Sequence, residues 1–177
     1  MIVWGQIQGT RPQEITHEVS VNGANLARAN FCVIPGGKGA NNGVAPEIVF
    51  KGKEVINYGI NVTLNGWLNF QENSPIIIKL SNGEIIEGKA IFDGTHDAYD
   101  YREIDPFAYY KFTKTSYSFS KEDIAKLREH GVVKIRVSDG VKNYDHNIGA
   151  LANKELLEGF DFLDNYVKNK PSLYDDF

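Results

Sequence analysis

The stretch Ile76-Ile-Ile-Lys-Leu-Ser-Asn-Gly-Glu-Ile-Ile-Glu-Gly-Lys-Ala-Ile-Phe92 decides the fold class of this chain. Two runs rich in isoleucine flank Asn82-Gly83. Asn-Gly is the dipeptide that reaches the positive φ angles of a two-residue hairpin turn at least cost. The stretch therefore predicts two antiparallel strands joined by a tight turn.

The same dipeptide recurs at 22–23, 42–43 and 65–66, each time between segments rich in Val, Ile, Leu or Phe. An interval of about twenty residues is the length of one hairpin, so the repeat predicts a series of hairpins. Further short strands are predicted at Thr16–Val21, Glu47–Phe50, Val55–Tyr58 and Asn61–Leu64. Residues 1–119 are therefore expected to form an antiparallel sandwich or barrel.

The first helix signal comes late in the chain. The hydroxyl of Ser120 can cap the backbone amide of Asp123, and Gly131 supplies a helix stop. The pattern predicts a short helix near 121–130, followed by a strand, a turn and a returning strand over 132–148.

A second helix is predicted near 154–168, with Asn153 as its N-cap. Its apolar residues recur at spacings of three and four and would share one face: Leu156, Phe160, Leu163 and Val167. Such a stripe must be covered, so we expect this helix to pack on an open face or end of the sheet.

The chain of 177 residues is predicted to be a single domain, 1–177, of the α+β class and mostly β. A β-rich part, 1–119, is followed by a strand-helix-hairpin-helix part, 117–170, which would be marginally stable by itself. The segment Tyr117–Val137 resembles a strand, capped helix and strand found in small uncharacterised bacterial proteins. That resemblance implies local structure and no chemistry.

Composition excludes several classes of function. A formal net charge of −4 provides no overall positive field, so no nucleic-acid partner is expected. No apolar run approaches the ~20 residues of a spanning helix, and no basic and apolar leader is present, so we expect no membrane partner and a cytoplasmic location. Cys32 is the single cysteine, which excludes a disulfide and a thiolate zinc site; it is expected to be a buried hydrophobe.

Gly36-Gly-Lys-Gly-Ala-Asn41 resembles a signature of the ribokinase family, in which the segment opens a helix and lines the sugar site. Here Pro46 stands where that helix should continue, and the Asp-Thr-x-Gly-Ala-Gly-Asp motif is absent. Without the catalytic aspartate no group deprotonates a hydroxyl, so the match is interpreted as coincidental. The segment is expected to be a flexible loop, with Lys38 as a candidate ligand contact.

An acidic loop, Asp93–Asp105, gathers five carboxylates and one imidazole. Clustered carboxylates repel one another unless a cation lies among them, so the loop is a candidate site for a divalent metal, the one cofactor considered. The candidate ligands are Asp93, His96, Asp97 and Asp100. The alternative is a solvated loop with Arg102 as a local ion-pair partner.

Aromatic residues gather over 99–119 and pair at i and i+2, which puts each pair on one face of an extended chain. If these aromatic side chains face inward, they pack in the core. Turned outward they would form a platform for a small ligand such as a carbohydrate, or a groove for a protein partner. The candidate contacts are Tyr99, Tyr101 and Tyr109.

No complete catalytic constellation is visible in the sequence, so no catalytic residue is predicted and an enzyme is disfavoured. The leading hypothesis is a non-catalytic binding or protein-interaction module of a bacterial cell. Two alternatives stay open: a metal-assisted hydrolase that uses the acidic loop 93–105, with His96 as base, and a structural assembly subunit.

Overall fold

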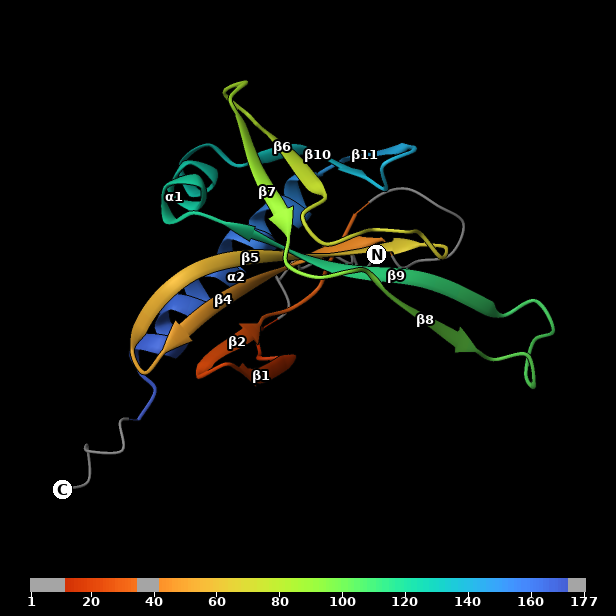
Figure 1. The fold of residues 1–177 in the computed structure, drawn as a ribbon, viewed down its shortest axis with the longest axis horizontal. Helices are drawn as coiled ribbons and strands as arrows, with labels where there is room; N and C mark the ends of the chain where they lie inside the picture. Colours follow the sequence, from red (N-terminus) through yellow and green to blue (C-terminus); the bar gives the residue numbers. More distant parts are fainter. Residues whose placement is uncertain (1–11, 35–41, 172–177) are drawn as a thin grey trace, which may run out of the picture.

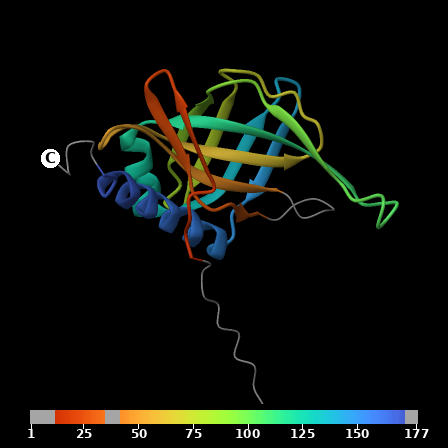
Figure 2. The same ribbon diagram turned by 90° about the horizontal axis from the view of Figure 1, so that it is seen from below.

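The computed structural model describes residues 12–34 and 42–171 (Figures 1 and 2). The strands and helices, in chain order, are β1 His17–Val21, β2 Ala24–Arg28, β3 Cys32–Val33, β4 Gly43–Lys51, β5 Glu54–Asn65, β6 Pro75–Leu80, β7 Ile85–Ala90, β8 Thr95–Asp100, β9 Tyr109–Phe119, α1 Lys121–His130, β10 Val132–Ser138, β11 Asn143–Asn147 and α2 Ala150–Lys168. The predicted α+β, mostly-β class is confirmed.

All the strands in the described ranges belong to one antiparallel sheet with the order β1-β2-β4-β5-β9-β7-β6-β10-β11. The short β3 pairs with β4, and β8 pairs with β9. The sheet is open, with β1 and β11 at the ends of its strand order, so it does not close into a barrel, which was one of the two expected forms. Helix α2 lies along one face of the sheet, as Figure 2 shows.

Helix α2 packs its apolar stripe against β4 and β5 and lies behind them in Figure 1. Leu156, Phe160 and Leu163 on this stripe are each at most 2% exposed. The ring of Phe160 meets the ring of Tyr58 from β5 edge to face, with centroids 5.8 Å apart. The predicted role of the second helix, covering an open face of the sheet, is therefore observed.

The start of α2 differs from the prediction. The helix begins at Ala150 with Gly149 as N-cap, and no side chain caps it. Asn153, the predicted cap, instead accepts a hydrogen bond from the backbone amide of Val132 at 2.7 Å. The Asn153 side chain, which the sequence predicts to cap the helix, is therefore used in a contact between α2 and β10. The shorter α1 follows its prediction, because the Ser120 hydroxyl accepts from the Asp123 amide.

The Asn-Gly pairs behave differently from one another. Asn22-Gly23 has both φ angles positive, at 51° and 79°, and turns the β1–β2 hairpin as expected. Asn82-Gly83 joins β6 to β7, the predicted hairpin, with positive φ at Gly83. Gly43 is no turn residue: it begins β4, and a Cβ there would lie 2.1 Å from Cζ of Phe31. The close contact with the Phe31 ring explains why a residue without a side chain stands at position 43.

The outer half of β9 pairs with β8 and extends from the body of the molecule as a ribbon (Figures 1 and 2). We call residues 95–114, which comprise β8, the connecting loop and the first half of β9, the arm. The aromatic residues of segment 99–119 are therefore partly in the core and partly at the surface. Phe112, Tyr117 and Phe119 are buried, whereas Tyr99 and Tyr101 are about half exposed.

Candidate ligand-binding site

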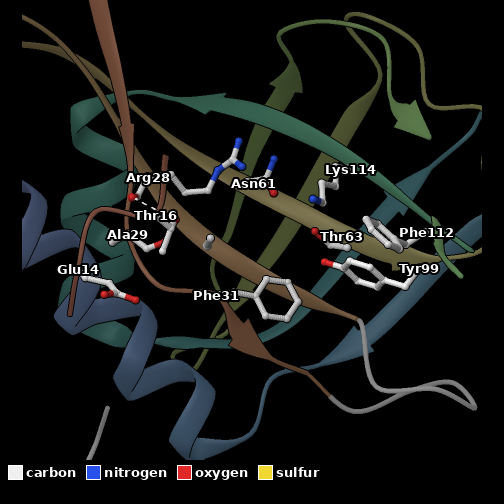
Figure 3. Close-up of a pocket in the computed structure, with 11 residues that line it drawn as sticks. Glu14, Thr16, Arg28, Ala29, Phe31, Asn61, Thr63, Tyr99, Phe112 and Lys114 are labelled. Atoms are coloured by element: carbon white, nitrogen blue, oxygen red, sulfur yellow. Dashed lines mark hydrogen bonds between the residues drawn. The ribbon is translucent and has the colours of Figure 1, made fainter. Parts of the chain in front are cut away.

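A cavity of about 400 Å³ lies between the root of the arm and the chain segment that leads into β1 and out of β2 (Figure 3). Its floor is formed by Ala45 of β4 and by Asn61 and Thr63 of β5. These residues alternate with core residues along their strands, so the floor is the sheet face opposite α2.

The floor is polar because apolar residues alternate with polar or small residues along β5. Ile60 and Val62 are at most 1% exposed and belong to the core under α2. Asn61 and Thr63 face the other way, and the Asn61 amide donates to the Ser116 hydroxyl of β9 at 3.0 Å. A small residue at Ala45 leaves room above this floor. The cavity therefore has fixed polar groups at its base.

Aromatic rings form two of the walls. Tyr99 and Phe112 come from the two strands of the arm, with ring centroids 4.9 Å apart. Phe31 lies on the other side of the cavity, as Figure 3 shows, with its ring over Gly43. A flat ligand could contact rings on both sides.

One of the cations that line the cavity is held in an ion pair. Arg28 lines the cavity, and the Arg28 Nε lies 2.7 Å from Oε1 of Glu47. Glu47 is fully buried and also accepts from the Ser116 hydroxyl at 3.1 Å. Burial raises the pKa of Glu47, and the nearby Arg28 opposes that rise. Glu47 Oε2 has no hydrogen-bond partner among the described residues.

A second cation, Lys114, also lines the cavity. It is half-buried and is the cross-strand neighbour of Thr63. Its ammonium lies 4.9 Å from the centroid of the Phe112 ring. Within residues 12–34 and 42–171 it makes no ion pair and no side-chain hydrogen bond.

The predicted ligand contacts are separated by the structure. Tyr99 lines the cavity, and Tyr101 stacks on it at 6.3 Å, farther toward the tip of the arm. Tyr109 lies on the opposite face of the ribbon, where Arg102 sits 4.6 Å from its ring centroid. Lys38 and the glycine-rich segment around it lie outside the described residues.

The first two predicted metal ligands make separate contacts. Asp93 Oδ1 accepts from the backbone amide of Glu72 at 2.8 Å. The His96 ring stacks on Trp67 with centroids 5.8 Å apart, and its Nε2 lies 2.8 Å from the carbonyl oxygen of Leu68. Asp93, in the loop that precedes the arm, and His96, at the root of the arm, are therefore each bonded to a neighbouring segment.

The other two are on the arm. Asp97 Oδ1 accepts from the amide of Ala98, and Asp100 forms a two-point pair with Arg102. The hydrogen bond from the Arg102 side chain holds the pKa of Asp100 at about 2. The expected local role of Arg102 is thus observed. No group of three or more acidic, histidine or cysteine side chains suited to a metal ion occurs in the described part of the chain.

Sequence reasoning missed most of the cavity. Arg28, Asn61 and Lys114 come from three different strands and are brought together by pairing. One signal was available: polar or small residues alternate with apolar residues along β5, at Gly59, Asn61 and Thr63. In a strand buried on both faces, that alternation marks a face that is polar.

Comparison of the chain with protein-family models, with curated proteins and with solved structures gives no match. Among the described residues no helix is long and apolar enough to cross a membrane.

Proposed function

We propose that this protein binds a small organic ligand in the cavity between the sheet and the arm. The observation that carries the proposal is the convergence of three aromatic rings, Phe31, Tyr99 and Phe112, above a polar floor in one cavity of about 400 Å³. Cavities of this size with apolar walls and a few placed polar groups are typical of small-molecule sites.

The lining favours a ligand with a ring. An aromatic or a sugar ring can lie against the half-exposed Tyr99, which the buried Phe112 supports from behind with ring centroids 4.9 Å apart. The Thr63 hydroxyl and Asn61 amide at the floor can hydrogen-bond to ring substituents. Binding without chemistry is the function that these groups support best, and a carbohydrate stays among the candidate ligands.

The test is a ligand-observed NMR screen with monosaccharides and single-ring aromatic compounds. Ala45→Leu fills the floor of the cavity, so compounds that show saturation transfer with the wild-type protein should lose it in this variant. Tyr99→Ala should weaken them about fivefold, because a stacked ring contributes roughly 1 kcal/mol. Tyr109→Ala, on the opposite face of the arm, is the matched control and should bind normally.

Thermal unfolding of Ala45→Leu first establishes that the variant is folded. Binding that is unchanged in the folded Ala45→Leu protein, or a screen in which the wild-type protein binds no compound, would contradict the proposal.

A second candidate, assembly through the arm, is favoured by the exposure of its tip. Ile104 is 87% and Phe107 is 91% exposed. Large apolar side chains that gather at a projecting end mark contact surfaces. We expect sedimentation velocity to show concentration-dependent association of the wild-type protein that is lost when both residues are changed to serine. A wild-type protein that stays monomeric at high concentration would exclude this candidate.

A further inference from the structure

The two cations that line the cavity are in different situations. Both Nε and Nη2 of Arg28 lie on Glu47 Oε1, at 2.7 and 2.6 Å. Since Glu47 is fully buried, moving Arg28 away would leave a carboxylate without a counter-charge inside the protein. Arg28 is therefore held by the protein itself and offers a ligand little net charge.

Lys114 has no such partner in the part of the chain that the structure describes. Its ammonium lies beside the Phe112 ring, and the Thr63 hydroxyl on the neighbouring strand likewise has no hydrogen-bond partner among the described residues. A half-buried ammonium is separated from part of the water that would solvate it. An anion in the cavity would supply the missing counter-charge, and Thr63 could donate to the same group.

The rest of the lining limits the charge of that anion. Glu14 stands on the wall opposite Lys114, as Figure 3 shows, and makes no ion pair with a described residue. A phosphate dianion would be repelled by Glu14 and would be neutralised by one available cation only. A monoanion such as a carboxylate matches one ammonium and one hydroxyl donor.

We propose that the ligand of this cavity is a small carboxylate with a flat apolar body, its carboxylate bound by Lys114 and Thr63 and its body placed among Phe31, Tyr99 and Phe112. The inference rests on the proposed function and adds the chemical class of the ligand.

The arm offers a matched control for Lys114. Lys111 lies on the same strand, and its ammonium sits 4.4 Å from the ring centroid of Trp67 and 5.5 Å from that of Tyr109. Both rings are on the face of the ribbon that points away from the cavity. Lys111→Met and Lys114→Met therefore remove the same charge from the two faces of one strand and keep the apolar stem.

The experiment compares 2-naphthoate with 2-naphthamide, which share the ring and differ in charge, by isothermal titration calorimetry. The wild-type protein should bind the carboxylate about tenfold more tightly than the amide, as one partly buried charge pair predicts. Lys114→Met should remove that preference, and Lys111→Met should retain it. Raising the ionic strength from about 0.02 M to about 0.3 M should weaken binding of the carboxylate alone.

Thr63→Val is a second variant at the same site and should weaken the carboxylate roughly threefold through loss of one hydrogen bond. Equal binding of the two probes to wild type, with no effect of Lys114→Met, would overturn the anion inference and leave the proposed ring-binding function standing. Binding of naphthoate to the filled Ala45→Leu cavity, or no binding of either probe to wild type, would overturn both.

Discussion

Glu47 is a charged side chain that is fully buried in the described structure. It sits on β4 over Gly59 of β5, where a Cβ on that glycine would lie 3.0 Å from Glu47 Oε2. The carboxylate is held from one side by Arg28 and from another by Ser116. Because burial raises its pKa above the ordinary value of 4.5, its charged form is disfavoured in the folded protein.

This residue predicts a pH dependence of folding. The folded state binds a proton at Glu47 more tightly than the unfolded state does, so the stabilisation from this group is fully present below the unfolded pKa of 4.5. It is lost as the pH rises through the higher folded pKa, by about 1.4 kcal/mol for each tenfold difference in proton affinity. Urea unfolding of wild type and Glu47→Gln between about pH 4 and about pH 8 measures it.

The difference between the two proteins is the informative quantity. The pKa values of Asp139 and Asp145 are lowered by their hydrogen bonds, so these groups add stability that is present above about pH 4 and lost at lower pH in both proteins. The loss of the Arg28 partner in Glu47→Gln adds an offset that does not change with pH in this range. Parallel stability curves for wild type and variant would show that the pKa of Glu47 is not raised.

Among the elements, α2 and β4 are in close contact at Gly159. A Cβ on Gly159 would lie 2.4 Å from Cγ of Pro46. Alanine is the better helix former by about 1 kcal/mol, so propensity alone favours its presence here. The contact with a rigid ring on β4 explains why the helix has glycine at this position.

Gly159→Ala should therefore destabilise the protein by roughly 1–3 kcal/mol, the usual cost of overpacking a core, despite its gain in helix propensity. Asn165→Ala, at an exposed position of the same helix, is the control and should be neutral or slightly stabilising. The free energy of unfolding in urea measures both changes. A more stable Gly159→Ala protein would mean that α2 can move away from β4 at little cost.

Elements that depend on local signals were predictable, and those that depend on distant contacts were not. The hairpin 76–92 and helix α1 carry their own turn and capping residues. The start of α2 was misplaced because Asn153 bonds to the amide of Val132. Gly43 was expected in a turn, but its small size serves the ring of Phe31.

Across the whole molecule, one apolar cluster includes residues of the sheet and of both helices, from Ala27 to Val167. Phe160 lies in this cluster and is fully buried. A shared core predicts that the described parts unfold together in one cooperative transition.

Phe160→Ala should lower the midpoint of that single transition by about 10 °C, from a cost of roughly 3–5 kcal/mol for a deleted core ring. Leu151→Ala, at a 53% exposed position of the same helix, should change it little. Calorimetry measures both, and two resolved transitions in either protein would show that the sheet and α2 do not share one cooperative core.

The candidate site also depends on the fold of the whole molecule. Tyr99 could be singled out from the aromatic pattern, because the i and i+2 spacing is local. The convergence of Arg28, Thr63 and Lys114 could not, since it follows from pairing of strands that are up to 86 residues apart in the chain (114 − 28). Strand order is a property of the folded molecule.

The arm is anchored to the sheet at one end, which gives it the mechanics of a cantilever. Tyr99, near the support, touches the cavity, whereas Ile104 and Phe107 are at the free end. In a beam of this kind a small rotation at the support becomes a larger sweep at the tip. A molecule bound between Phe31 and Tyr99 would therefore restrict the range of positions that the tip of the arm can take, many ångströms away.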